Sequence, residues 1–282
     1  MVESASRRMI NAVLLNVVVA IGGIITVAPL VWMVSASFKP LNEIYAYPPS
    51  IIPVNFSTAN YERLLTDWPF LNWYGNSLVV AVLLTFAVLF FTSLAGFGFA
   101  KYRFKGSNLL FIILLGSTMI PFQLILVPLF IFMSRLGWTN SYWCLIVPFM
   151  APAVGIFLMR QFLMSIPTEL IEAARIDGAT EFGIYWRVIL PLARPALAAQ
   201  AVLTFRGAWN SVLWPLSVLH KQVSMTLPVG MASMIGGVTA GSEPPIGASM
   251  AAATLVTIPV IIIFVAVQKQ YIAGLTAASV KQ

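Results

Sequence analysis

The stretch WPFLNWYGNSLVVAVLLTFAVLFFTSLAGFGFA, residues 68–100, decides the fold class because it contains no charged side chain. A helix needs about 20 consecutive apolar residues to cross the hydrocarbon core of a bilayer. Other uncharged runs of more than this length occupy residues 9–38, 106–134, 136–159 and 244–268, and residues 195–219 are interrupted only by Arg206. Because hydrocarbon offers the backbone no hydrogen-bond partner, we expect each run to be a helix. The sequence therefore predicts an all-α polytopic membrane protein.

The composition agrees with a membrane solvent and also predicts the orientation. Charged residues make up 9% of the chain, whereas a soluble domain carries about 25%. If the N-terminus is cytoplasmic and six spans alternate, eleven Lys and Arg residues fall in inside segments and four in outside segments. Such an excess is typical of cytoplasmic loops. We therefore expect both termini in the cytoplasm, and we interpret the net charge of +7 as a mark of topology and not of a nucleic-acid partner.

Six spans follow from these runs. We predict them at residues 12–37, 73–100, 109–133, 142–162, 196–219 and 246–268. The first belongs with a short N-terminal tail, over residues 1–37, and is too long for a cleaved signal peptide, whose apolar part has about 7–15 residues. Residues 38–70 are expected to form an ordered extracytoplasmic loop, residues 71–270 the transport core and residues 271–282 a C-terminal tail. Uncharged residues 222–242 are interpreted as an external loop, with a re-entrant segment left open, in preference to a seventh span.

Two residue types inside the spans carry structural expectations. Cys144 is the only cysteine, which excludes an intrachain disulfide and any site built from several cysteines, so no metal is expected. We interpret it as a small packing residue. Prolines recur within the apolar runs, and membrane helices accept them as kinks. They are Pro29, Pro121, Pro128, Pro148, Pro152, Pro215 and Pro259.

Residues 167–195, PTELIEAARIDGATEFGIYWRVILPLARP, interrupt the apolar pattern with charge. Thr168 is expected to cap a first helix, in which Glu172 and Arg175 could form an ion pair. Gly178 is expected to end that helix in a left-handed conformation, and Thr180 to cap a second one. The apolar residues of the second helix recur at a spacing of three and four, which predicts one stripe. They are Phe182, Tyr185, Trp186 and Ile189.

This segment is too short and too polar to cross a membrane. An amphipathic helix pair lying on lipid headgroups would explain it, and so would a docking element for a cytoplasmic partner. Its residues resemble the cytoplasmic signature of ABC importer permeases, which reads EAA, three residues, G, nine residues, I-x-L-P. Val188 stands where the signature has Ile. The matching residues are Glu172, Ala173, Ala174, Gly178, Leu190 and Pro191.

Three other stretches resemble the carbohydrate-uptake branch of the same family, the relatives of the maltose permease subunits. They are AGFGFAKYRFKG (95–106), WNSVLWPL (209–216) and YIAGLTAASVKQ (271–282). The resemblance implies a type I ABC importer permease fold in a bacterial or archaeal cytoplasmic membrane. The implied partners are a second similar permease, an ATPase subunit dimer and an extracytoplasmic solute-binding protein, and the implied substrate is a sugar.

In that family the signature segment forms coupling helices that sit in a cleft of the ATPase subunit. The resemblance therefore implies an ATPase-coupling set consisting of Glu172, Ala173, Ala174, Asp177, Gly178, Leu190 and Pro191. The chain contains no GK[ST] phosphate-binding motif of its own. ATP and Mg²⁺ are accordingly expected on the partner, and neither an enzymatic activity nor a bound cofactor is expected here.

The candidate substrate path rests on fewer residues. Arg206 is a charge near the middle of the fifth predicted span, where an unpaired Arg costs about 2.5–3.5 kcal/mol on insertion scales. Trp209 and Asn210 follow at three and four residues, which would place an aromatic ring and an amide on the same face. Gln123 is a further candidate. Contacts with a partner subunit or between helices would also explain these residues. A non-sugar solute, such as a sugar phosphate or a polyamine derivative, and a stand-alone secondary transporter or channel are the alternative functions.

Overall fold

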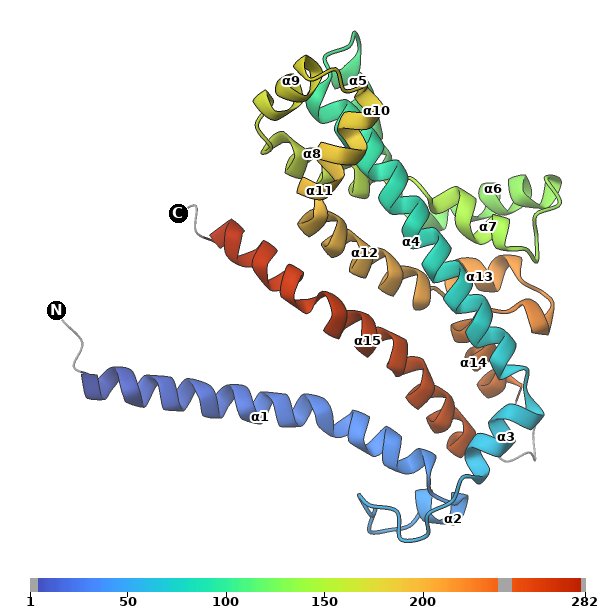
Figure 1. Cartoon of the computed structure of the whole chain (residues 1–282). Helices are drawn as coiled ribbons and strands as arrows, with labels where there is room; N and C mark the ends of the chain where they lie inside the picture. The colour runs from blue at the N-terminus through green and yellow to red at the C-terminus, as the bar shows by residue number, and fades with distance from the viewer. Residues whose placement is uncertain (1–4, 238–244, 280–282) are drawn as a thin grey trace. The chain divides into compact units, whose positions relative to one another are not determined.

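The computed structural model describes residues 5–237 and 245–279, and every regular element in these residues is helical (Figure 1). Residues 1–4, 238–244 and 280–282 lie outside the described residues, and with them part of the predicted 222–242 loop and the end of the C-terminal tail. The chain divides into two compact units. One contains the residues up to Phe70 together with Met231–Ile258, and the other contains Leu71–Gly230 together with the residues from Pro259 onwards.

The first unit begins with α1 (Ala5–Ser37), a single long helix, followed by the short helices α2 (Leu41–Ile44) and α3 (Ala59–Asp67). The segment between α1 and α4 is ordered by hydrogen bonds to its own backbone. The Asn60 Nδ2 donates to the carbonyls of Ser37, at 3.0 Å, and of Lys39, at 2.8 Å. Lys39 is buried, its Nζ donates to the carbonyl of Ser50, and it lies 4.5 Å from the centre of the Trp32 ring.

The second unit is built around α4 (Phe70–Lys101), which continues through the whole of the predicted second span. The helices α5 (Ser107–Ser117), α6 (Phe122–Arg135), α7 (Tyr142–Ile146) and α8 (Ala153–Met164) follow. Short helices α9 (Glu169–Ile176), α10 (Glu181–Ile184) and α11 (Leu190–Leu192) gather near the Lys101 end of α4 (Figure 1). Then come α12 (Arg194–Trp209) and α13 (Leu213–Val218). Two helices divide between the units, α14 (Leu227–Gly236) and α15 (Ile246–Ser279).

By length and apolar composition, the described residues contain up to six membrane spans when each bent helix pair is counted as one span. The three continuous ones are Val13–Ser37, Phe70–Lys101 and Ile246–Ala266. The helix α14 has only ten residues, a length of about 15 Å at 1.5 Å per residue, which is too short to cross a bilayer alone. The described part of residues 222–242 therefore contains no complete seventh span.

The other three spans are broken, whereas the sequence predicted helices at 109–133, 142–162 and 196–219 that are only kinked at their prolines. The first pair, α5 and α6, bends by 98°, and the pair that contains α7 and α8 bends by 44°. Pro121 and Pro152 end these two breaks with extended ψ angles of 137° and 135°. A proline cannot donate to the preceding turn, which explains why the ladder stops there. Pro29, Pro128 and Pro259 instead lie inside helices that continue through them.

The fifth predicted span is wrong in its extent. The helix α12 ends at Trp209, residues 210–212 are not helical, and α13 begins at Leu213. By length and composition, the helix pair that could cross consists of residues 181–192 and 194–209, which meet at an angle of 78°. Its first member belongs to the charged 167–195 stretch that the sequence places outside the membrane, so α12 is the part expected to lie in the bilayer. Asn210 closes α12, because its backbone N–H and its side-chain Nδ2 both donate to the Arg206 carbonyl, at 3.1 and 3.0 Å.

Small residues let α4, α8 and α12 approach each other closely. A Cβ added at Gly96 of α4 would lie 2.7 Å from the Met159 Cβ and 3.0 Å from the Arg160 nitrogen, both on α8. Between α4 and α12, the buried Gln200 Nε2 donates to the Thr92 Oγ1 at 2.8 Å. Such close backbone approach is typical of helix pairs in membranes, where interfaces favour small residues.

The buried carboxyl of Glu43 makes the α1–α4 segment sensitive to acid. It is 8% exposed and accepts from the N–H groups of Val54 and Asn55, at 2.7 and 3.0 Å. These two bonds lower the pKa of Glu43 from its ordinary 4.5, against the opposing effect of burial. Because a lowered pKa favours the charged folded form, this stabilisation is complete above about 4.5 and is lost as the pH falls through the lower folded value.

We expect hydrogen exchange of residues 38–57, corrected for the intrinsic rate, to accelerate when the pH falls from 7 to 3. Glu43→Gln should already exchange faster at pH 7 and gain little more from acid. Glu62→Gln, which removes a carboxylate from the exposed surface of α3, should behave like the unchanged protein. Protection of residues 38–57 that stays constant down to pH 3 would contradict this role of Glu43.

Candidate functional site

Residues 169–192, here called the coupling segment, begin with a helix that a glycine ends. Gly178 has a φ of +80° and donates to the Arg175 carbonyl at 3.0 Å, and Ala179 donates to the Ala174 carbonyl at 3.0 Å. This pair of bonds is the Schellman arrangement, in which the left-handed residue is usually glycine. The predicted glycine turn is confirmed.

The two predicted threonine caps differ. Thr180 has an extended backbone, and its Oγ1 accepts from the Gly183 N–H at 3.1 Å, as a cap of α10 should. Thr168 instead has helical angles, φ −71° and ψ −25°, and its side chain makes no capping hydrogen bond. A capping side chain normally belongs to a residue with extended angles, which explains why this prediction is wrong.

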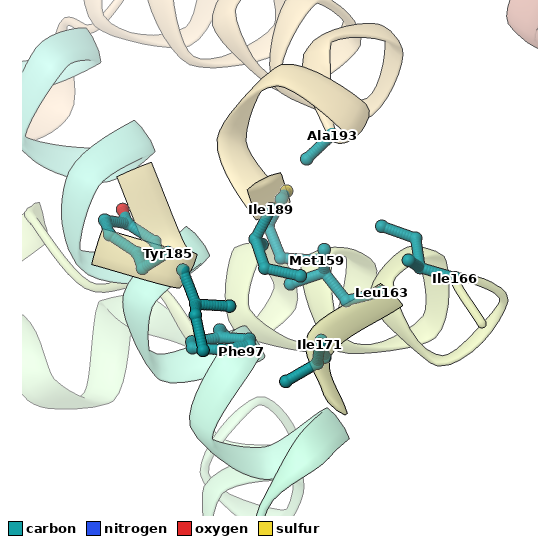
Figure 2. Packing of buried hydrophobic residues seen from close by; sticks show 9 residues of the cluster. Phe97, Met159, Leu163, Ile166, Ile171, Tyr185, Ile189 and Ala193 are labelled. Atoms are coloured by element: carbon teal, nitrogen blue, oxygen red, sulfur yellow. The ribbon is translucent and has the colours of Figure 1, made fainter. Parts of the chain in front are cut away.

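The inner face of the coupling segment is fixed to α4 and α8 by a cluster of buried side chains, which we call the seat. Figure 2 shows Tyr185, Ile189 and Ile171 of the segment converging on Phe97 of α4 and on Met159 and Leu163 of α8. The complete cluster consists of Phe97, Met159, Leu163, Ile166, Ile171, Ile184, Tyr185, Ile189 and Ala193. Burial of apolar surface contributes about 25 cal/mol of stabilisation per Å² removed from water. The nine buried side chains of the seat therefore hold the segment against α4 and α8.

The stripe predicted on the second helix is only half correct. Tyr185 and Ile189 are buried, but Phe182 and Trp186 are exposed, and Ile184 takes their place in the seat. Residues Tyr185–Ile189 form a π-helical turn, in which hydrogen bonds join residues five apart. This wider turn changes which residues share a face, and the 3.6-residue period does not anticipate it.

A polar contact ties the segment to the end of α4. The Arg175 Nε and Nη2 donate to the two Glu181 oxygens, at 2.7 and 3.2 Å, and the Tyr102 hydroxyl donates to the Glu181 Oε2. The Arg175 guanidinium also lies 5.8 Å from the Tyr102 ring centre. The predicted Glu172–Arg175 pair is therefore wrong, because Arg175 reaches across the glycine turn to Glu181. Sequence reasoning missed Tyr102 and Glu181, although both lie at helix ends beside the turn.

A second polar contact lies inside the seat. The Tyr185 hydroxyl and the Ser93 Oγ are 2.7 Å apart, and both side chains are buried. A buried hydroxyl without a partner would cost about 1–3 kcal/mol, so this pair fixes the register of the segment along α4.

The outer face of the segment is open. Glu172, Ala173, Asp177, Gly178 and Pro191 are exposed, while Ala174 and Leu190 are half-buried against the seat. Ile176 is 87% exposed, and exposed Phe182 and Trp186 add aromatic surface. Apolar surface gathered beside charged groups is typical of a protein interaction site.

The residues predicted for a substrate path are not all on one face. Arg206, Asn210 and Gln123 are exposed. Trp209 is 0% exposed, with its ring stacked on Phe205 at 5.7 Å and edge-on to Tyr74 at 5.5 Å. The expected shared face of Arg206 and Trp209 is therefore absent, and Gln123 lies on α6, just after the Pro121 break.

A cavity of about 430 Å³ lies beside three breaks between helices, those of α5–α6, α7–α8 and α12–α13. Its walls include Phe122 after the first of these breaks, Phe149 and Pro152 around the second, and Ser211 and Val212 between α12 and α13. Thr226 also lines it, is 3% exposed, and its Oγ1 has no hydrogen-bond partner among the described residues. A buried hydroxyl without a partner, on a residue that lines a cavity, is a candidate contact for a polar ligand.

Comparisons with known proteins extend this geometry. The family model described as "Binding-protein-dependent transport system inner membrane component" matches residues 89–276. The chain is 35% identical, over 278 residues, to an arabinooligosaccharides transport system permease protein of Halalkalibacterium halodurans. The aligned region covers 95% of this chain and 96% of that protein.

Two solved structures are similar. One, of a bacterial ABC transporter involved in the import of the acidic polysaccharide alginate, has a TM-score of 0.84 and 26% identity, over 96% of this chain and 99% of that chain. The other, an alginate ABC transporter in complex with a periplasmic protein bound to an alginate pentasaccharide, has a TM-score of 0.66 and 14% identity, over 92% of this chain and 93% of that chain. The second likeness concerns the fold alone.

The matched region covers more than half of the chain and contains the seat, the coupling segment and most of the residues that line the cavity. Its family is a component of membrane transport systems and not an enzyme. The chain therefore belongs to the binding-protein-dependent transport system inner membrane components, the multi-pass permease subunits of ABC importers.

Proposed function

We propose that this chain is one of two permease subunits in an ATP-driven importer that carries a sugar or an oligosaccharide delivered by an extracytoplasmic binding protein. The observation that carries the proposal is the coupling segment, which has a rigid inner face and an open outer face. The named substrates of the relatives, arabinooligosaccharides and alginate, support a saccharide.

The outer face is proposed as the docking site of an ATPase subunit, which binds ATP and Mg²⁺. Glu172 projects from the exposed side of α9, in its first turn. A basic residue of the partner would pair with this carboxylate, and charge-assisted hydrogen bonds of this kind contribute about 1.5–3 kcal/mol. Asp177 and Gly178 present the turn itself, and Ala173 leaves room for the partner's backbone. Both chain termini would then lie on the same, cytoplasmic side as the segment.

The proposed role of the seat is to pass movement of the docked segment into the spans. Displacement of α9 carries Glu181 and Tyr185 with it, because the Arg175–Glu181 pair and the glycine turn join the two short helices. Glu181 contacts Tyr102 and Tyr185 contacts Ser93, so this displacement would pull on the last part of α4. Leu190 and Pro191 lead directly into α12, so the same movement reaches the fifth span.

The cavity at the three breaks is proposed as a sugar subsite on the transport path. Phe122, Phe149 and Trp214 supply aromatic surface, against which the C–H faces of a sugar stack. Thr226 and Ser211 supply hydroxyl groups for its hydroxyls. Broken membrane helices commonly surround substrate sites near the bilayer midplane. Arg206, Asn210 and Gln123 remain proposed contacts along the path, and Trp209 would contact substrate only after leaving its packing with Phe205.

Glu172→Lys should leave the protein folded in the membrane but weaken association with the ATPase subunit by at least about tenfold, since the lost pair becomes a repulsion. Co-purification and sugar uptake into proteoliposomes measure the two effects. Glu169→Lys is the matched control, because it makes the same charge change one turn earlier in the same helix. Equal losses in both variants, or normal association of Glu172→Lys, would contradict the docking role.

Thr226→Val should lower sugar-stimulated ATP hydrolysis several-fold without lowering the thermal stability of the complex. Valine has the same shape and removes a buried oxygen that has no partner, and an unsatisfied group of this kind costs about 1–3 kcal/mol. Thr85→Val is the control. Thr85 lies on α4 and is buried like Thr226, but its hydroxyl donates to the Ala81 carbonyl. Full stimulation in Thr226→Val would exclude the proposed subsite.

A second candidate substrate, an acidic saccharide, is favoured by Arg206. Its cation is exposed within a span of the chain, and the alginate importer at 26% identity carries an acidic polysaccharide. Arg206→Gln should then reduce stimulation by an alginate oligosaccharide by about tenfold, the loss expected for one charge-assisted hydrogen bond. Stimulation by a neutral arabinooligosaccharide should change much less, and an equal effect on both would leave the neutral saccharide as the better assignment.

A further inference from the structure

A cavity of about 780 Å³ lies at the Lys101 end of α4, apart from the proposed sugar subsite. The end of α4, the 102–106 link, the beginning of α5 and the end of α8 form most of its walls. Three cationic side chains line it, those of Lys101, Arg103 and Arg160, and no carboxylate does. This concentration of charge of one sign is unusual in a chain with few charges, and its function is not explained by ATPase coupling or by sugar transport.

Two of the cations are held in place by carbonyl groups. The Arg160 Nε donates to the Phe99 carbonyl at 3.3 Å, and its guanidinium lies 4.2 Å from the centre of the Phe111 ring. The Lys101 Nζ donates to the Ile166 carbonyl. Both groups retain further N–H donors, because an arginine has five and a lysine three. Their positions are therefore fixed while part of their hydrogen-bonding capacity stays available.

The positive charge is not neutralised within the described residues. The ion pairs found there are Arg63–Asp67 and Arg175–Glu181, so none involves a cation of this cavity. Glu169 attracts the charge of Lys101 without forming an ion pair. Arg103 is exposed and makes neither a hydrogen bond nor an ion pair in the described chain. The cavity thus offers an anion at least two cationic groups.

The first turn of α5 adds a second source of positive potential. Gly106 precedes it with a φ of +86°, and Ser107, Asn108 and Leu109 of this turn line the cavity. The helix has eleven residues. The N–H groups at the beginning of a helix carry a partial positive charge and bind phosphate oxygens readily. Cations and helix terminus therefore converge on the same volume.

The surface beyond the cavity is apolar. Along α5, Leu109 is 62% exposed and Ile112 65% exposed, and Leu110 and Ile113 are exposed beside them. Met164 on α8 adds apolar surface at the rim. This apolar surface belongs to a helix pair that is long and apolar enough to cross a membrane, so we expect the cations at its end to lie where the hydrocarbon ends. A molecule that fits both parts carries a phosphate next to acyl chains.

We propose that this cavity, lined by Lys101, Arg103 and Arg160, binds the headgroup phosphate of an anionic membrane phospholipid whose acyl chains lie along α5. Free inorganic phosphate would use the same cations but not the apolar surface. A partner protein would have to insert acidic groups at the edge of the membrane. The continuous apolar surface of α5 favours the lipid over both.

The test uses the full-length chain purified together with its co-purifying subunits in neutral detergent. Native mass spectrometry would count retained phosphatidylglycerol and phosphatidylcholine, and thermal unfolding would be followed with added dioctanoyl phosphatidylglycerol. Arg103→Gln should reduce phosphatidylglycerol retention about fivefold, as expected for loss of one cation near a headgroup. Arg103→Lys should restore most of it. Lys105→Gln is the matched control, because Lys105 is exposed two residues away but does not line the cavity.

Three results would overturn the proposal. Equal losses in Arg103→Gln and Lys105→Gln would mean that only the general charge of the surface matters. Stabilisation by inorganic phosphate as strong as that by dioctanoyl phosphatidylglycerol would assign the cavity to a free anion. Retention only after the ATPase subunits are removed would show that a protein covers the cavity in the assembly. None of these results depends on whether the transported solute is a sugar, so the two proposals can fail separately.

Discussion

The constraint on which the whole structure depends is that backbone N–H and C=O groups in hydrocarbon must find partners within the protein. Continuous helices such as α4 meet it automatically. The three broken spans do not, because each break frees carbonyl or N–H groups that need another partner. The α5–α6 break, the α7–α8 break and the non-helical residues between α12 and α13 border the same cavity, which is lined by Phe122, Phe149 and Ser211. Much of the irregular backbone is thus concentrated around one cavity, the proposed site of the polar solute.

The two faces of the coupling segment differ in their surroundings. Its inner face is apolar and enclosed, and the two contacts at Ser93 and Tyr102 fix it in register with α4. Its outer face keeps Glu172 and Asp177 in water and leaves Ile176 exposed. An amphipathic pair lying on headgroups would place its apolar side chains in lipid, but most of those side chains are used in the seat. The side chains that stay exposed are partly charged and partly apolar, and such a surface suits contact with a protein better than contact with a bilayer.

Local structure was predictable from the sequence wherever it depends on one residue type or on one apolar run. The apolar runs reveal the spans, Gly178 marks the left-handed turn and Thr180 marks a cap. Outcomes that depend on neighbours were not predictable. Pro121 lies in the break between α5 and α6, directly before α6, while Pro128 lies inside α6, although both occur in the same apolar run. Arg175 had Glu172 and Glu181 within reach, and only the fold of the glycine turn brings the second one close. Trp209 is buried, and its contact with Tyr74 of α4 depends on helix packing, whereas its stacking on Phe205 is a local contact four residues apart in α12.

The helix α12 connects the two proposed sites mechanically. Only Ala193 separates it from the coupling segment, and it ends at Trp209, beside the break that borders the cavity. Its sixteen residues form a rod of about 24 Å. Near its middle, Gln200 is buried and bonded to Thr92 of α4, and such a contact in a close-packed site favours rotation about a fixed point over sliding. A small tilt imposed at Pro191 would then move Ser211 and Val212 in the opposite direction. The break at residues 210–212 makes this movement local, because it separates α12 from α13 and lets the cavity change shape while α13 stays packed through Trp214.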